Sequence, residues 1–160
     1  MEWGDFHPIE ELPHVLNPQS GFMQNCNSSP FTTTDDDNPS MKDFPAYMVE
    51  DATDDKRRAK LSRWLLRQAE DVTFEDWQTM AYDTTLYWPM TELPRYQSRF
   101  KQLAASDPDL AEQVRPYLTH LLDWDYRSTI DSTQTTLAIA WYEELYGRGY
   151  PVETLKAEFT

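Results

Sequence analysis

The stretch DPDLAEQVRPYLTHLL, residues 107–122, decides the fold class of this chain. Asp107 followed by Pro108 is typical of a helix start, where an aspartate caps free backbone N–H groups and a proline fits the first turn. The apolar residues that follow recur at helical spacing: Leu110, Val114, Tyr117, Leu118, Leu121 and Leu122. The stretch therefore predicts an amphipathic helix with one apolar face.

Further helices are expected on both sides of this one. Thr73 and Asp76 stand at the spacing of a capping box, and Gly147 is a suitable helix stop. The other expected helices run over about 56–69, from Thr73 to a stop at Pro89, and over about 92–105, 132–146 and 152–158. The first of them carries an apolar stripe of Leu61, Trp64, Leu65 and Ala69.

The first 52 or so residues have a different character. Prolines recur there too often for a helix of useful length, at positions 8, 13, 18, 30, 39 and 45. Turns and short extended pieces are expected instead. The sequence therefore predicts an α+β fold that is mostly helical, in one partial domain. An extended and loop segment covers residues 1–52, and a helical segment covers residues 53–160.

The net charge of −14 is distributed unevenly along the chain. Residues 1–55 hold 12 acidic side chains against Lys42 alone, whereas residues 56–160 hold 16 acidic and 13 basic side chains. Such a balance repels nucleic-acid phosphates and anionic lipid headgroups, so neither kind of partner is expected. No stretch approaches the roughly 18 apolar residues of a membrane span, and MEWGDFHPIEEL lacks the features of a secretion signal. The localisation stays open.

Few side chains stand at spacings that favour catalysis or metal binding. The three histidines are scattered, which favours structural or surface roles, and the one cysteine, Cys26, has no base nearby in the sequence. Asp35, Asp36 and Asp37 are consecutive rather than alternating, so a solvated acidic turn is favoured over a calcium site. We therefore expect neither a metal ligand set nor a cofactor.

A basic cluster follows the acidic first part of the chain. It consists of Lys56, Arg57, Arg58, Lys60, Arg63 and Arg67, which are 6 of the 14 basic residues. The simpler interpretation is a solvated helix face that offsets the neighbouring acids. The alternative is that one of these arginines turns inward and supports a polar site on residues 17–31.

The stretch NPQSGFMQNCNSSPF, residues 17–31, is almost free of charge yet rich in side-chain amides. Amide NH₂ groups are donors that do not titrate, and preorganised neutral donors stabilise a developing oxyanion. An asparagine in a proline-flanked turn more often bonds its own backbone, however. Composition alone leaves both roles open, with the turn role favoured for any single asparagine.

The run ELPHVLNPQSGFMQNCNSSPFTTT, residues 11–34, resembles a segment of the β-subunit of penicillin acylases and of the related cephalosporin and acyl-homoserine-lactone acylases. Weaker matches follow in the same order as in that family. They are RRAKLSRWLL at 57–66, FEDWQTMAYDTTLY at 74–87 and LLDWDYRSTIDSTQTTLAIAWYEEL at 121–145. The resemblance covers nearly all 160 residues.

The resemblance implies an N-terminal nucleophile hydrolase with a layered αββα sandwich. In that family a Ser, Cys or Thr at the start of a mature chain attacks an amide, with its own α-amino group as the base. By the same resemblance, Asn27 donates its side-chain amide to the oxyanion hole. The family's arginine at the start of the following helix matches Arg57 best, with Arg58 close in register.

The resemblance also sets expectations for substrate and partners. The substrate would be a small acyl amide, of the β-lactam side-chain or acyl-homoserine-lactone type. Some family members hold a structural calcium ion, and many are periplasmic or secreted. The remaining acylase α- and β-subunit segments would be the protein partners.

The start Met1-Glu2 provides no such nucleophile, because removal of methionine before glutamate is not expected. We therefore expect an interior fragment of the β-subunit that is catalytically silent by itself. Two other interpretations stay open. One is a non-catalytic helical interaction module derived from an acylase, and the other is a small carbohydrate-binding or glycosidase-like protein, suggested by the tryptophan and acid content.

Overall fold

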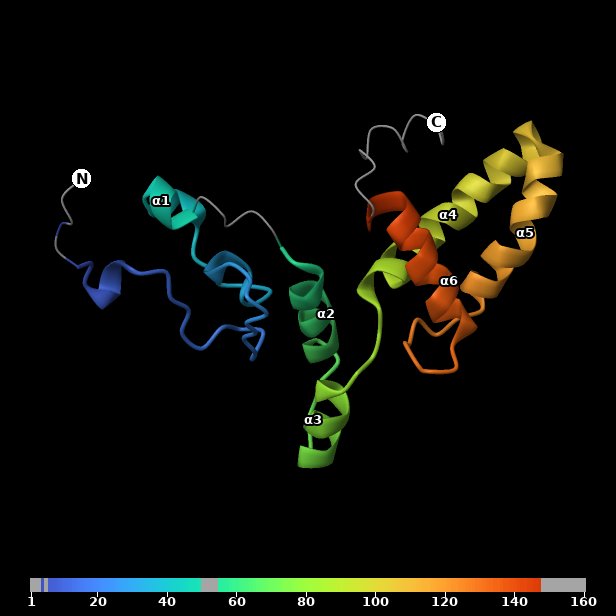
Figure 1. Cartoon of the computed structure of the whole chain (residues 1–160). Coiled ribbons are helices and arrows are strands. Elements are labelled where there is room, and N and C mark those ends of the chain that lie inside the picture. Colours follow the sequence, from blue (N-terminus) through green and yellow to red (C-terminus); the bar gives the residue numbers. More distant parts are fainter. Residues whose placement is uncertain (1–3, 5, 50–54, 148–160) are drawn as a thin grey trace. The chain divides into compact units, whose positions relative to one another are not determined.

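The structure, a computed structural model, describes residue 4 and residues 6–49 and 55–147. The chain divides into two compact units, Met1–Met80 and Ala81–Thr160. The regular elements of both units, among the described residues, are helices (Figure 1). The prediction of a mostly helical fold is confirmed.

The first unit begins with turns and short helices rather than extended strands. Three 3₁₀ turns, η1 (Ile9–Glu11), η2 (Pro30–Thr32) and η3 (Met41–Asp43), precede the one-turn helix α1 (Ala46–Val49). Helices α2 (Arg57–Leu66) and α3 (Phe74–Ala81) follow. Within the described residues there is no β-strand, so the β part of the predicted α+β fold is not found there, and the αββα sandwich stays a prediction.

The described part of the second unit contains the α-helices α4 (Tyr87–Ser106), α5 (Pro108–Leu122) and α6 (Thr133–Tyr142). Helices α4 and α5 form a hairpin that turns at Asp107 (Figure 1). The Asp107 carboxylate accepts a hydrogen bond from the Leu110 N–H at 3.0 Å, which confirms the predicted cap. Ser132 caps α6 in the same way, accepting from the Thr135 N–H at 3.0 Å.

The core of the second unit is built from few aliphatic side chains and several rings. Leu93, Leu121, Trp124 and Ala138 are buried, and the partly buried Trp88, Trp141 and Leu137 are among the side chains that pack against them. Only part of the predicted α5 stripe is covered. Leu110 and Tyr117 remain exposed on the outer side of the helix.

The boundary between α3 and α4 corrects one prediction. The helix that starts after Thr73 ends at Ala81, not at Pro89, and α4 already begins at Tyr87. Pro89 lies in the first turn of α4, where the missing N–H would have no intrahelical acceptor. The break between α3 and α4 depends on a residue far away in the sequence. The Leu86 N–H donates to the Tyr126 carbonyl at 2.9 Å, and this hydrogen bond holds Leu86 outside a helix.

The C-terminal end of α6 changes helix type. A π-helical segment, Glu143–Gly147, continues from Tyr142 to the last described residue, so the expected stop at Gly147 stays a prediction. The expected helix over 152–158 lies outside the described residues. Among the described helices, none combines the length and the apolar character needed to cross a bilayer.

An ion pair between the covered side chain of Asp83 and the exposed side chain of Arg127 joins the two connecting segments of the second unit. The Asp83 carboxylate, 6% exposed, receives Arg127 Nη2 at 2.9 Å and the Thr85 N–H at 2.9 Å. Burial raises the pKa of Asp83, but the hydrogen bonds from Thr85 and the charge and hydrogen bond of Arg127 outweigh it, so the pKa lies below its ordinary value. Ionised Asp83 therefore stabilises the folded state.

This gives a pH-dependent prediction for Asp83→Asn. Because the folded pKa lies below the unfolded pKa of about 3.9, the contribution is complete above that pH and is lost as the pH falls through the folded value. We expect Asp83→Asn to lower Tm at neutral pH, and the difference from the unchanged chain to close in acid, as the pH falls through the folded pKa of Asp83. A difference in Tm that stays constant from neutral pH into acid contradicts the prediction.

Candidate functional site

The segment Asn17–Thr34, called here the Asn27 loop, is folded by its own side-chain amides. The Asn25 Oδ1 accepts a hydrogen bond from the Asn27 N–H at 2.9 Å, which closes a tight turn. Asn27 has a φ of 56°, a left-handed conformation that asparagine tolerates better than most residues. The Asn27 side chain is exposed at the tip of this turn.

Gln24 ties together the two arms of the Asn27 loop. It is 8% exposed, its N–H donates to the Thr33 carbonyl at 2.9 Å, and its Nε2 donates to the Thr32 carbonyl at 2.9 Å. Nε2 also lies 3.4 Å from the Ser28 hydroxyl. Asn25 and Gln24 therefore hold the turn through their side-chain amides.

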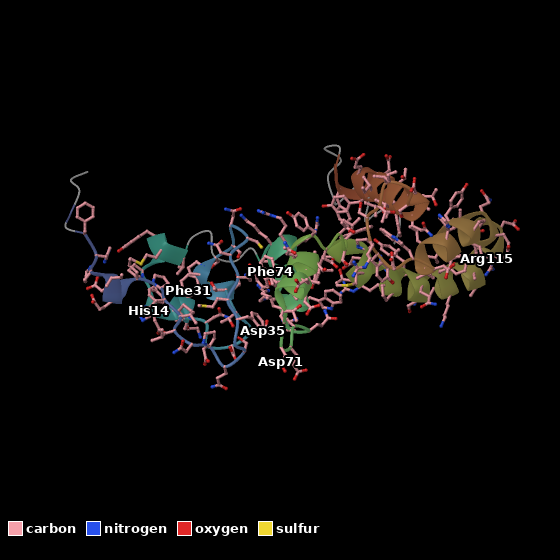
Figure 2. All side chains as sticks on the ribbon, turned by 90° about the horizontal axis from the view of Figure 1, so that it is seen from below. His14, Phe31, Asp35, Asp71, Phe74 and Arg115 are labelled. Carbon is pink, nitrogen blue, oxygen red and sulfur yellow. The ribbon has the colours of Figure 1, made fainter. Side chains whose placement is uncertain are left out.

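The buried aromatic side chain of Phe31 anchors the Asn27 loop. Phe31 is buried and packs edge-on against Phe44, with ring centroids 5.5 Å apart. The Ser29 hydroxyl caps the start of η2 by accepting from the Phe31 N–H at 3.1 Å. Phe31 and the acidic residue Asp35 both lie on the segment before α1 (Figure 2). The same loop therefore carries an exposed polar turn at Asn27 and a buried apolar contact at Phe31.

Helix α2 packs against the Asn27 loop with an arginine on its buried face. Ala59 and Arg63 are buried, whereas the predicted apolar stripe of Leu61, Trp64, Leu65 and Ala69 is only half-buried. Arg63 Nη1 donates to the Thr32 carbonyl at 2.7 Å, and Nη2 donates to the Asp55 carboxylate at 2.5 Å. One arginine of the basic cluster does turn inward, but it bonds Thr32 and Asp55 rather than residues 17–31, so its support of a polar site there stays a prediction.

A second arginine of α2 contacts Asn27 itself. Arg58 Nη2 donates to Asn27 Oδ1 at 3.0 Å. A guanidinium donates and never accepts, so this contact fixes the amide with its oxygen toward Arg58 and its NH₂ group directed elsewhere. Arg57, the position that the resemblance favoured, is exposed at the first residue of α2. Arg58, the neighbouring position that the resemblance left open, therefore contacts Asn27.

Comparison with known protein families identifies the chain. The family model described as penicillin amidase matches residues 1–154 of the 160. The chain belongs to the penicillin amidase family. The match contains the Asn27 loop and α2, so the contact between Asn27 and Arg58 lies within penicillin amidase sequence, and the chain is of acylase-like hydrolase origin.

The three consecutive aspartates of this penicillin amidase chain face different partners. Asp35 pairs with Arg67, whose Nη2 lies 2.6 Å from its Oδ1, and this guanidinium holds the pKa of Asp35 below its ordinary value despite partial burial. Asp37 accepts from the Gln19 N–H at 3.1 Å, and Asp36 accepts from the Thr34 hydroxyl at 3.4 Å. Across the described residues no three His, Cys, Asp or Glu side chains are grouped as metal ligands.

The histidines that could serve as bases make hydrogen bonds with exposed side chains or with backbone. His7 bonds Glu11 at 2.7 Å and Tyr47 at 2.5 Å, and His120 bonds the Thr133 hydroxyl at 2.8 Å. All three histidines are exposed, in agreement with the surface roles expected for them. Cys26 is a free, half-buried thiol beside Asn27. The pair of Asn27 and Arg58 offers an oriented, uncharged amide donor at an exposed turn.

Proposed function

We propose that this chain forms part of an acylase that hydrolyses a small acyl amide, with the Asn27 side-chain NH₂ as an oxyanion-hole donor. The observation that carries the proposal is the hydrogen bond from Arg58 Nη2 to Asn27 Oδ1 at 3.0 Å. It orients an exposed, non-titrating amide before any substrate binds. A donor fixed in advance needs no reorganisation when charge develops, and this makes it effective in catalysis.

The reaction requires a nucleophile, which we assign to an N-terminal Ser, Cys or Thr on another acylase segment. Its side chain attacks the amide carbon while its α-amino group accepts the proton. A new bond forms to the carbonyl carbon, and the carbonyl π electrons move onto oxygen, where Asn27 Nδ2 donates a hydrogen bond. When this intermediate collapses, the C–N bond breaks and the amine leaves with the proton. Water then releases the carboxylic acid from the acyl-enzyme.

Arg58 serves in this proposal as a positioning residue. It touches Asn27 Oδ1 and holds the amide plane in one orientation. Its positive charge also draws electron density toward the amide oxygen, which makes the NH₂ group a better donor. Arg57 remains a predicted site residue, with a supporting role beside the same turn.

We propose the class of substrate from the family, and we name no individual substrate. We propose an amide outside the peptide class, either a β-lactam side-chain amide or an acyl-homoserine lactone. The protein partners are the remaining acylase α- and β-subunit segments. Asn27, Asn25 and Arg58 need no metal ion for the roles proposed here.

The proposal is tested in an assembled acylase, meaning this chain joined with the remaining segments of a family acylase. Release of the amine from acyl amides of p-nitroaniline measures turnover. We expect hydrolysis by the assembled acylase and none by the chain alone. We also expect Asn27→Ala to lower kcat by about 100-fold or more, and unchanged turnover in that variant would overturn the proposal.

Replacement of Arg58 tests how the amide is held. Because a hydrogen bond from a charged donor contributes about 1.5–3 kcal/mol, we expect Arg58→Met to lower kcat of the assembled acylase by about 10-fold or more. Arg58→Lys should recover part of the loss, since lysine keeps the charge but not the planar fork. The matched control is Lys60→Met, which removes a cation from the same helix. Equal losses in Arg58→Met and Lys60→Met would show a general charge effect and contradict the positioning role.

A further inference from the structure

Arg63 is a buried cation that joins three separate segments of the first unit. It is 7% exposed and donates to the Thr32 carbonyl at 2.7 Å and to the Asp55 carboxylate at 2.5 Å. Its Nε also lies 3.6 Å from the Asp35 carboxylate. Arginine is rarely buried unless it is paired, so this side chain needs an explanation beyond surface charge.

The Thr32 carbonyl is the point where the Asn27 loop meets helix α2. It accepts from Arg63 Nη1 at 2.7 Å and from Gln24 Nε2 at 2.9 Å. Gln24 lies on the arm of the loop before Asn27, and Thr32 lies on the arm after it. This shared acceptor therefore fixes both arms of the loop to α2.

Arg58 and Arg63 donate hydrogen bonds to the Asn27 loop from two positions along α2. They are five positions apart, which is about 7.5 Å along the axis of an α-helix. Arg58 holds the Asn27 side chain, and Arg63 holds the backbone that carries the loop. If the loop shifted on α2, the contact between Arg58 and Asn27 would change as well.

The contacts among Arg63, Thr32, Gln24 and Asp55 form a polar junction between the Asn27 loop and α2, and burying these polar groups lowers the stability of the folded state. Gln24 Oε1 and Asp55 Oδ1 are buried and have no hydrogen-bond donor among the described residues. Burying charged and incompletely bonded groups is unfavourable, and apolar side chains of similar size often stabilise such a place equally well or better. A polar junction does, however, fix geometry through directional bonds, which apolar contacts do not.

We propose that Arg63 is a positioning residue for Asn27, acting through the Thr32 carbonyl. This inference rests on the proposed function of Asn27 as an oxyanion donor. Arg63 itself contacts neither substrate nor reacting atoms. It sets the place of the Asn27 turn on α2, and with it the direction of the amide that Arg58 orients.

The test is a double-mutant cycle in the assembled acylase, with Arg63→Lys and Asn27→Gly singly and together. Lysine keeps the positive charge and cannot reproduce the fork that bonds Thr32 and Asp55 together. We expect Arg63→Lys to lower kcat by between about 10- and 100-fold with little change in KM, because small displacements of catalytic groups have effects of this size. In the Asn27→Gly background the same change should have no further effect on kcat. Arg95→Lys, at an exposed ion pair with Glu92, is the matched control and should leave kcat unchanged.

The outcomes separate the two proposals. If kcat falls by the same factor in both backgrounds, Arg63 acts independently of Asn27 and the inference is wrong. If Asn27→Gly lowers kcat but Arg63→Lys does not, the inference is wrong and the proposed function stands. If Asn27→Gly leaves kcat unchanged, the proposed function fails and the inference fails with it.

Discussion

Asn27→Gly is expected to lower kcat of the assembled acylase by about 100-fold or more, with little change in KM. Glycine adopts the φ of 56° found at Asn27 without steric cost, so the turn is kept while the whole side-chain amide, with its NH₂ donor and its Oδ1 acceptor, is lost. Because the hydrogen bond strengthens only as charge develops on the carbonyl oxygen, its loss affects the transition state and not the bound substrate. Steady-state kinetics on a chromogenic acyl amide measure both constants.

Asn27→Asp is the companion variant, because it separates the donor from the contact with Arg58. The carboxylate keeps an acceptor 3.0 Å from Arg58 Nη2 and gains an ion pair, while the NH₂ donor is replaced by a negative charge. We expect a loss in kcat at least as large as in Asn27→Gly, together with an unchanged or higher Tm. Retained activity in Asn27→Asp would show that the contact with Arg58 matters and that the donor does not. Asn27→Ala is less informative alone, since alanine is strained at this φ.

Phe31→Ala is expected to destabilise the first unit by about 3–5 kcal/mol. The side chain is 7% exposed and packs against Phe44, so its removal leaves a cavity within the segment that carries the Asn27 loop. Because the chain consists of two units, a single global transition need not report on this one. Hydrogen exchange of peptides covering residues 17–38 measures the local loss directly.

Phe74→Ala is the matched control, because Phe74 is 70% exposed. Removing it leaves no cavity and should leave exchange in residues 17–38 unchanged. Similar exchange in Phe31→Ala and in the unchanged chain would mean that the loop does not depend on its aromatic anchor.

Local chemistry explains which elements the sequence predicts well. The cap at Asp107 involves residues three positions apart, and the box of Thr73 and Asp76 is found as expected: each residue's side chain bonds the other's N–H, at 3.2 Å and 3.0 Å. Such signals act within one turn of helix, so the residues that create them are neighbours in the sequence. The starts of α3 and α5 were predictable for this reason.

Contacts between distant residues account for what the sequence could not show. The hydrogen bond between Leu86 and Tyr126 moves the start of α4, and nothing near Pro89 indicates it. Arg58 and Asn27 are 31 positions apart, so only the folded chain decides between Arg57 and Arg58 as the partner of Asn27. The family resemblance narrowed that choice to two residues.

Arg63 carried a weak signal in the sequence. It follows Ala59 by four positions, so a small side chain and an arginine share one face of α2, and this is the face that is buried. The apolar stripe of Leu61, Trp64 and Leu65 predicted a different face toward the core. A basic residue on the inward face is uncommon, and a stripe of large apolar side chains outweighs it in any argument from hydrophobic pattern alone.

The central claim is that Asn27 stabilises the negatively charged oxygen of the tetrahedral intermediate. The most direct measurement is the inhibition constant of a boronic acid analogue of the acyl group, whose tetrahedral adduct places an oxygen where the oxyanion forms. The claim predicts that this constant rises by about 100-fold in Asn27→Gly while KM for the amide substrate stays the same. An inhibition constant that is equal in Asn27→Gly and in the unchanged assembled acylase would contradict it.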